Sequence, residues 1–430
     1  MTRLALALAL GATLGVLGCG DEPSSSVSEP TSASATPAPP AVPLSVAAAP
    51  AAVQHPGGPY REQAKTLLSS VIDREAGNPA NAWALAHGIL AKGPDFAATD
   101  GRRAIDVLVN DFLQAEKLPG LKGLQPFFPK ETEAGLPVEP HTDLILKTLV
   151  EAGLSLDEPL TKAAGAPTLE RLLRSSRARH VASPGSKGKE AFASPDDVAW
   201  SIQAWCQGSY AGAPETWRAS NGKDEEVHAV ALQQLEMLEA ETWFMRQAMI
   251  DGSTVKKQRQ GIFGFTCGGA HLYQAVTACA KAGYPKDDKA KARIAKLNEI
   301  YLWRIPLETK MVEEAMQVAP KLAPLLYNQD VKFLGHLLES LGKAERDGLF
   351  IPTPEERLLL QDAEGRLLAH VLQMKKLRVY EPAMLAGWMN SKESGTRQFY
   401  LDVVGDASHA YRGLSIQEEL RVKRSEATGN

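Results

Sequence analysis

The stretch HLYQAVTACAKAG, residues 271–283, decides the fold because its pattern recurs along the chain. It begins with a polar residue, continues as an apolar, Ala-rich run of helical character, and ends on glycine, a common C-terminal helix stop. Similar helical composition fills most of the chain, whereas the alternation typical of strands is scarce. The sequence therefore predicts an all-α fold.

Four further stretches of thirteen residues share the polar start and the glycine end. They are NAWALAHGILAKG (81–93), HTDLILKTLVEAG (141–153), DDVAWSIQAWCQG (196–208) and DVKFLGHLLESLG (330–342). Each gap between stretches has room for a second, more charged helix, such as residues 288–303. The repeat therefore predicts a domain of helical hairpins over residues 59–414, with the glycine-ended helices inside, followed by a charged tail at 415–430.

This layout resembles the α/α-toroid proteins, which include terpenoid cyclases, protein prenyltransferases and several six-hairpin glycosidases and polysaccharide lyases. The resemblance covers residues 59–414 and consists of architecture and repeat spacing. It implies a closed ring of six hairpins, whose sixth inner helix would lie in residues 380–413, where DVVGDASHAYRG (402–413) fits the pattern loosely. An open α-solenoid of the same hairpins is the alternative. The DxDD motif of squalene-type cyclases is absent from the sequence, which argues against terpene chemistry.

The first residues carry the pattern of an exported protein. Residues 1–19 contain one early arginine, an apolar run and a final cysteine, as in a signal peptide. The end of this segment, VLGC (16–19), resembles the lipobox of bacterial lipoproteins, whose cysteine is lipidated. Residues 20–58 are rich in Ser, Pro and Ala and indicate a disordered tether. We therefore expect a membrane partner through lipidated Cys19 and a place in the bacterial cell envelope, with an ordinary secretory signal as the alternative.

Charge and cysteine content exclude some classes of protein. The net charge is −4 and the charged residues are mixed, which argues against a nucleic-acid partner. The basic stretch KKQR (256–259) is interpreted as a solvated loop. Beyond the lipobox the chain has Cys206, Cys267 and Cys279, so it holds at most one intramolecular disulfide. Cys206 and Cys279 are the candidate pair, and two buried thiols are the alternative.

The repeat also predicts a site. In toroid proteins the inner helices are parallel, and their N-terminal ends surround one mouth of the cavity. That arrangement would bring together the first residues of the five stretches: Asn81, His141, Asp196, His271 and Asp330. Asn and Asp at a helix start also cap free amides, which is a purely structural alternative. Histidine is not a favoured cap, and the helix dipole keeps it neutral, as a base or a metal ligand requires.

Two chemical models use these residues. In the first, His141, His271 and one or more of Asp196, Asp197 and Asp330 hold a divalent metal such as zinc, to which Cys267 could add a thiolate. In the second there is no metal: one of the histidines acts as a base, and Asp196 or Asp330 acts as an acid on a glycan. The catalytic candidates are therefore His141, His271, Asp196 and Asp330.

Other residues near the repeated position are candidates for ligand binding: Asn81, Trp83, Asp143, Asp197 and Tyr273. The aromatic members could stack on a sugar, although simple packing is the alternative. The glycine-rich loop 260–269 is predicted to cover the cavity. We expect a cavity enzyme that acts on a glycan or another envelope molecule. The alternative is a non-catalytic binding or scaffold lipoprotein that recognises a protein or polysaccharide.

Overall fold

The computed structural model describes residues 58–119, 121–180, 195–210, 212–258 and 260–428. Most of these residues lie in helices, and the strands form two small two-stranded sheets, so the all-α prediction is confirmed. Among the described residues, none of the helices combines the length and the hydropathy that a bilayer span requires. The predicted export signal, the lipobox Cys19 and nearly all of the tether lie outside the described residues.

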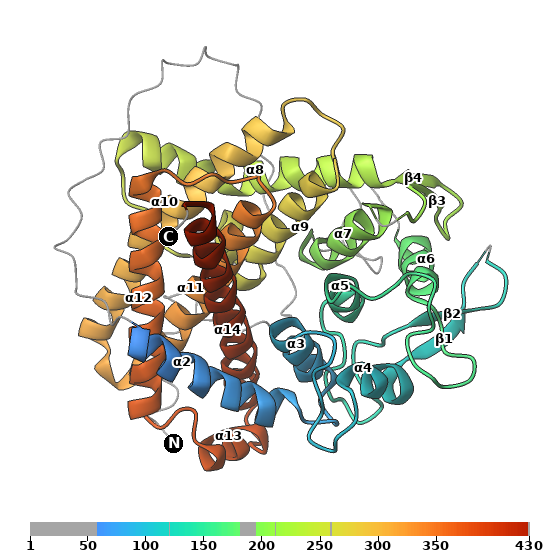
Figure 1. The fold of residues 1–430 in the computed structure, drawn as a ribbon, viewed down its shortest axis with the longest axis horizontal. Coiled ribbons are helices and arrows are strands. Elements are labelled where there is room, and N and C mark those ends of the chain that lie inside the picture. Colours follow the sequence, from blue (N-terminus) through green and yellow to red (C-terminus); the bar gives the residue numbers. More distant parts are fainter. Residues whose placement is uncertain (1–57, 120, 181–194, 211, 259, 429–430) are drawn as a thin grey trace.

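Six helices surround the centre of the molecule (Figure 1). These inner helices are α3 (Ala82–Lys92), α5 (Leu144–Glu151), α7 (Pro195–Tyr210), α9 (Ala270–Lys281), α11 (Ala323–Arg346) and α14 (Ser394–Thr428). Neighbours in this order contact each other, and α14 also contacts α3, so the cycle of contacts closes. The first five contain the glycine-ended stretches, and α14 contains residues 402–413. A toroid of six hairpins requires such a cycle, whereas an open array would leave its first and last helices apart.

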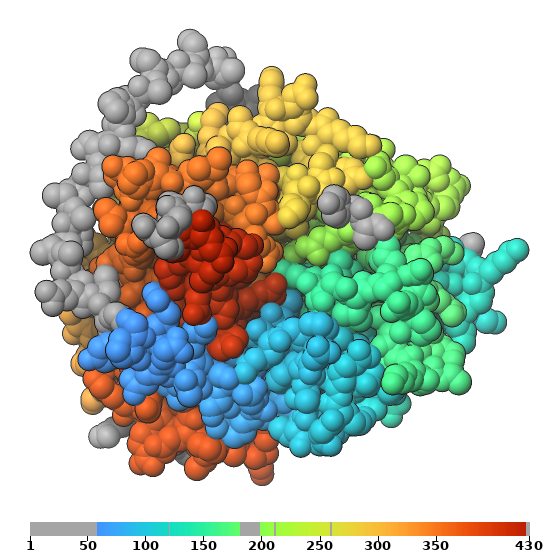
Figure 2. Space-filling view, viewed as in Figure 1, coloured from blue at the N-terminus to red at the C-terminus, as the bar shows by residue number. Residues whose placement is uncertain are grey.

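The remaining elements surround the inner helices (Figure 1). The outer helices are α2 (Gly58–Val71) with η1 (Ile72–Ala76), α4 (Ala104–Val107) with η2 (Leu108–Phe112), α6 (Leu169–Arg179), α8 (Val227–Asp251), α10 (Ala290–Val318), α12 (Pro354–Lys376) and α13 (Pro382–Met389). The connections contain the turns η3 (Gly261–Gly264), η4 (Thr266–Gly269) and η5 (Pro320–Leu322), and the antiparallel pairs β1 (Gln114–Lys117) with β2 (Leu124–Phe127) and β3 (Thr216–Arg218) with β4 (Asp224–Glu226). Figure 2 shows the C-terminal turns of α14 at the surface, beside α2.

Burial distinguishes the inner helices from the outer ones. Residues 270–279 of α9 are all buried, and so are residues 82–89 of α3. A helix that is surrounded by protein needs no charged face, which explains why these two segments contain no Asp, Glu, Lys or Arg. The outer helix α8 instead buries residues spaced three and four apart along its length: Val227, Val230, Ala231, Gln234, Leu235 and Leu238. The sequence difference between apolar and charged helices therefore corresponds to position in the fold.

Several helix boundaries differ from the prediction. α5 begins at Leu144 rather than at His141, and α7 and α11 continue past the predicted stops Gly208 and Gly342. α11 begins at Ala323 rather than at Asp330, directly after the turn η5. α14 continues to Thr428, so most of the predicted tail 415–430 belongs to the last inner helix. Ile416 and Leu420 are buried and lie four residues apart, on one face of that helix. Because the residues around Ile416 and Leu420 are mostly charged or polar, the composition of residues 415–430 predicted a tail instead of a helix.

Glycines bring α11 and α14 unusually close together. A β-carbon added at Gly335 would lie 2.9 Å from Cα of Ala410, and one at Gly413 would lie 2.8 Å from the carbonyl oxygen of Gly335. Both separations are shorter than a normal contact between heavy atoms. Only glycine therefore permits this approach, which sets His336 and His409 beside each other, with ring centres 3.8 Å apart.

One disulfide joins two neighbouring inner helices. Cys206 of α7 is bonded to Cys279 of α9, and Cys267 takes no part in a disulfide, so the first of the two sequence alternatives is confirmed. Both bonded cysteines are buried, and they are 73 residues apart in the sequence. The bond therefore closes a long loop of the unfolded chain, which is the condition under which a cross-link restricts that chain most.

We expect the Cys206→Ala/Cys279→Ala variant to lose about 2 to 4 kcal/mol of unfolding free energy, because its unfolded chain is no longer restricted. Urea unfolding followed by circular dichroism measures the difference. The parent protein unfolded and refolded in dithiothreitol should have the midpoint of the variant. Equal midpoints for the oxidised parent and the variant would contradict a stabilising bond.

Candidate functional site

The inner helices enclose a small pocket at the centre of the molecule. Every inner helix, or the segment just before it, contributes to its lining: Trp83, His87, His141, Leu144, Trp200, Cys267, His271, His336, Asp402, Gly405, Asp406 and His409. Five of these residues are histidines. The space inside is about 20 Å³, enough for a water molecule or a metal ion. In this conformation the pocket therefore does not admit a sugar ring.

Two pocket histidines make the same contact in different helices. Nδ1 of His87 lies 2.8 Å from the carbonyl oxygen of Trp83, and Nδ1 of His336 lies 2.9 Å from that of Lys332. A carbonyl oxygen only accepts, so Nδ1 donates in both cases and Nε2 of the neutral ring carries the lone pair. Nε2 of His336 is buried and has no hydrogen-bond partner. His336 is therefore in the protonation state of a metal-ligating imidazole.

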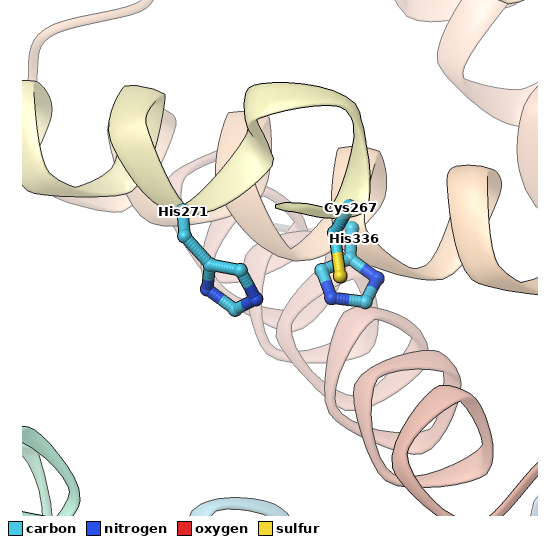
Figure 3. Close-up of side chains that lie close together, drawn as sticks. All are labelled: Cys267, His271 and His336. Carbon is cyan, nitrogen blue, oxygen red and sulfur yellow. The ribbon is translucent and has the colours of Figure 1, made fainter. Parts of the chain in front are cut away.

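Cys267, His271 and His336 form a close group of possible ligands (Figure 3). Sγ of Cys267 and one ring nitrogen from each histidine all lie within 4.8 Å of one another. A tetrahedral zinc ion holds sulfur and nitrogen ligands about 3.5 Å apart, so modest side-chain rotations would complete such a site. Nδ1 of His271 is also buried without a hydrogen-bond partner. Buried polar atoms normally have partners, and a metal ion would supply one here.

The loop before α9 brings Cys267 into the pocket through a left-handed backbone. Cys267, Gly268 and Gly269 have φ values of 52°, 60° and 75°. Glycine adopts this conformation readily, but at Cys267 it is strained and must be held by surrounding contacts. Nη1 of Arg304 donates to the carbonyl oxygen of Gly268 at 2.9 Å, and the Tyr301 hydroxyl donates to that of Gly269 at 2.8 Å. The loop that was predicted to cover the cavity thus contributes a lining residue to it.

A buried group of charges extends from the pocket into the space between the inner helices. We call it the interior ion network, and its members are Lys147, Glu151, Glu339, Lys343, His409 and Arg412. Nδ1 of His409 lies 2.6 Å from Oε2 of Glu339. Arg412 lies between the two carboxylates, 2.7 Å from Glu151 and 3.3 Å from Glu339. Because His409 also lines the pocket, the network holds one wall of the pocket in place.

Burial and neighbouring charges determine the protonation states around the pocket. Burial lowers the pKa of His271 well below its ordinary value, and the nearby His336 and His409 lower it further. Burial, followed by the charge of His409, likewise lowers the pKa of His336. Burial alone would raise the pKa of Glu339, but Arg412 and His409 hold it well below its usual range. The pocket therefore combines neutral imidazoles, which can bind a metal, with an ionised carboxylate that orients His409.

Both histidines predicted from the repeat line the pocket. His141 lies just before α5 and stacks on Trp200 with ring centres 4.4 Å apart. His271 is the second residue of α9, and its ring centre lies 4.5 Å from that of Trp200. His141 does not belong to the close group formed by Cys267, His271 and His336. Of the three residues in that group, the sequence therefore predicted His271 as a site residue and Cys267 as a possible additional ligand.

Asp330 and Asn81 do not reach the pocket, so the convergence predicted for them is wrong. Oδ2 of Asp330 lies 2.8 Å from Nδ1 of His370 on the outer helix α12. Because α11 begins at Ala323, residue 330 is in the helix interior and faces the outer layer rather than starting the helix. The Asn81 side chain accepts a hydrogen bond from the amide of Ala84 at 3.0 Å and caps α3. Asn81 is therefore a helix cap, which was the structural alternative to a role in the site.

The two aromatic candidates for ligand binding have different positions. Trp83 lines the pocket, and its ring centre lies 4.0 Å from that of His87. Tyr273 is fully buried, and its hydroxyl donates to Oδ1 of Asn298 on α10, in the outer layer. The expected place of Tyr273 beside the cavity is therefore wrong, because this side of α9 packs against α10.

Asp143, the acidic candidate near α5, does not line the pocket either. Asp143 precedes α5, and its Oδ2 accepts hydrogen bonds from the hydroxyls of Ser176 and Ser201. It therefore links the start of α5 to α6 and α7. Asp196 and Asp197 belong to the first turn of α7, and their side chains lie outside the part of the chain that the structure describes.

Three pocket histidines, His87, His336 and His409, lie outside the predicted set. The first two occupy the seventh position of their stretches, NAWALAH and DVKFLGH. The recurrence of histidine at the seventh residue of two stretches was the sequence signal that could have identified His87 and His336. His409 lies in the loosely fitting stretch of α14. The pocket thus meets α9 at its start and α11 and α14 well inside the helix, and it meets α3 both at its start, through Trp83, and further in, through His87.

Comparison with known proteins gives no family for this chain. No family model matches the sequence, no curated protein matches it, and no solved structure matches its fold. The functional argument therefore rests on the pocket itself and on the side chains that line it.

Proposed function

We propose that the pocket is a catalytic metal centre of the zinc type, held by Cys267, His271 and His336, in a lipid-anchored protein of the bacterial cell envelope. The observation that carries this proposal is the convergence of one ligand atom from each residue within 4.8 Å. One thiolate and two imidazoles are a ligand set that suits zinc. Three protein ligands are also the number typical of catalytic zinc sites, which keep a fourth position for water or substrate.

The other pocket residues fit a centre of this kind. The space inside the pocket is about 20 Å³, which is enough for one metal ion. A bound zinc ion would supply a Lewis acid that brings the pKa of water near neutrality. His409 lines the pocket and its Nδ1 faces the Glu339 carboxylate, so whenever the ring is neutral its lone pair is on Nε2. His409 is therefore placed to accept a proton, and Glu339 stabilises the imidazolium that results.

The proposed substrate is a glycan or another envelope molecule, as the predicted export signal and lipobox suggest. The closed cycle of helix contacts supports the toroid over the open array. In that arrangement separate parts of the chain deliver their ligands to one centre. The small size of the pocket adds a condition, because the reacting group of the substrate must enter while the larger part of the substrate stays outside.

Elemental analysis of the purified full chain tests the metal centre. We expect a stoichiometric divalent metal, such as zinc, which is lost from the His271→Ala/His336→Ala variant because two of three ligands are gone. Cobalt substitution should produce a thiolate-to-cobalt charge-transfer absorption that disappears in Cys267→Ser. Release of soluble sugar from purified cell-wall polysaccharide by the zinc-loaded parent, and its loss in His409→Gln, tests the catalytic step.

His228→Ala is the matched control. This histidine lies on α8 outside the pocket, where its Nδ1 accepts a hydrogen bond from the amide of Lys286 at 2.8 Å. The metal content of this variant should equal that of the parent, and circular dichroism establishes that each variant is folded. A folded parent that takes up no divalent metal after dialysis against zinc would contradict the proposed centre.

A further inference from the structure

A second, larger cavity lies among the outer elements. Its volume is about 520 Å³, which is within the range of small-molecule sites. Residues 254–258, the C-terminal part of α10 and the first turns of α11 form its walls, and we call it the outer groove. None of its lining residues lines the central pocket. The outer groove is therefore a separate candidate site.

The walls of the outer groove are mainly apolar. The larger apolar lining residues are Val255, Met311, Val312, Val318, Leu326 and Phe333. Val318 is 78% exposed, whereas Leu326 is only 2% exposed. Apolar surface therefore extends from the opening to the bottom of the groove, as in grooves that bind a ligand. A ligand with an apolar chain would remove this surface from water, which is favourable in proportion to the area buried.

One side of the outer groove carries excess positive charge. The carboxylate of Glu308 is paired with Arg304 and with Lys257, each at 2.7 Å. This trio contains two cations and one anion, so one positive charge is not compensated. The neighbouring Lys256 is exposed, and it has no ion-pair partner among the described residues. Both lysines line the groove.

The other two carboxylates of the outer groove have partners. Glu314 lies 3.8 Å from Lys310, and Asp330 lies 2.8 Å from the ring of His370. Among the described residues, neither carboxylate forms an ion pair with Lys256 or Lys257. The groove therefore has an apolar wall and one cationic end, a combination that complements a chain with an anionic end.

We propose that the outer groove binds an amphiphile with one apolar chain and one anionic head group, a carboxylate or a phosphate. The chain lies against the apolar wall formed by α10 and α11, and the head group contacts Lys256 and Lys257. Lysine is a compact charge on a flexible stem and suits either head group. Lys256 and Lys257, which belong to a stretch interpreted from sequence as a solvated loop, thereby gain a binding role. This proposal does not depend on the metal centre.

Isothermal titration calorimetry of the purified full chain tests the proposal. The probes are dodecanoate and dodecyl phosphate, each below its micellar concentration, and dodecyltrimethylammonium as the cationic equivalent. We expect saturable one-site binding of an anionic probe and at least about tenfold weaker binding of the cationic one. The tighter of the two anionic probes identifies the head group. Lys256→Glu should weaken the anionic probes about tenfold or more, because it reverses a charge at the head group.

Two further variants make the result specific. Lys296→Glu makes the same charge change at an exposed lysine of α10 outside the groove, and should leave the affinity within about twofold. Ala315→Trp fills the groove, because Ala315 lines it and is 8% exposed, and should abolish binding in a chain with native circular dichroism. The proposal would be overturned if neither anionic probe bound, or if the anionic and cationic probes bound with equal affinity. It would also be overturned if Lys256→Glu or Ala315→Trp left the binding unchanged.

Discussion

The Glu151→Gln variant will lose about 3 to 5 kcal/mol of unfolding free energy, because it leaves buried cations without a counter-charge. Glu151 lies 2.6 Å from Lys147 and 2.7 Å from Arg412, and it also contacts Lys343. The Lys147 side chain is only 1% exposed, so solvent does not replace the lost carboxylate. Apart from His409, the interior ion network contains three cations and two carboxylates. The substitution raises its excess from one to two positive charges.

A double-mutant cycle isolates the contribution of that charge. Lys147→Met/Glu151→Gln removes one cation together with the carboxylate and returns the network to its original excess charge. We expect this double variant to be more stable than Glu151→Gln alone, by about 1 to 3 kcal/mol in urea unfolding. Glu116→Gln is the surface control, because Glu116 is 46% exposed and pairs with Arg179, and it should change stability by less than about 1 kcal/mol. Additive single effects would show that Lys147 and Glu151 are not coupled.

The pH dependence of the parent gives an independent check. Although burial alone would raise it, the charges of Arg412, Lys147 and Lys343 hold the pKa of Glu151 well below the ordinary value of 4.5. A carboxyl group with a lowered folded pKa stabilises the fold above its unfolded pKa, and this stabilisation is lost as pH falls below that value. The stability difference between the parent and Glu151→Gln should therefore be full at pH 7 and shrink below about pH 4.5.

The inner helices could be predicted because their signal is local. Apolar runs such as residues 271–283 depend only on neighbouring residues, and five of the six inner helices carry them. The predicted glycine stop ends three of these helices, whereas α7 and α11 continue past Gly208 and Gly342. α14 lacks this signal, because charged residues accompany its buried Ile416 and Leu420. The repeat also identified His141 and His271 as residues of the pocket. It identified them because the pocket lies near the N-terminal ends of α5 and α9.

The rest of the site depends on contacts that no local pattern contains. Glu151 and Arg412 are 261 residues apart and would each be read as a surface charge. His336 lies in the pocket because α11 begins at Ala323 and passes the centre of the molecule in mid-helix. The depth at which each helix meets the pocket follows from helix length and packing, so a single repeated position could not predict the whole ligand group.

The Arg304→Met variant should lose about 3 kcal/mol of unfolding free energy and should bind metal about 10 to 100-fold more weakly. The Arg304 side chain is 1% exposed; its Nε lies 2.7 Å from Glu308, and its Nη1 donates to the carbonyl oxygen of Gly268. The substitution leaves buried Glu308 with Lys257 alone and the Gly268 carbonyl without this donor. The strained backbone of the adjacent Cys267 then loses one of the contacts that hold its thiolate in the pocket.

Three variants separate the effect on the metal from the effect on stability. Arg293→Met is the matched control on α10, because its pair with Glu239 is partly exposed, and it should leave metal affinity unchanged. Arg304→Lys keeps the charge beside Glu308 but lacks the fork that reaches Gly268 at the same time, so it should recover stability more than metal affinity. Competition with a zinc chelator measures the affinity, and urea unfolding of the metal-free proteins measures the stability. If Arg304→Met were less stable yet bound metal as tightly as the parent, Arg304 would support the fold without positioning Cys267, and the ligand loop would be held by its other contacts, among them the Tyr301 hydroxyl.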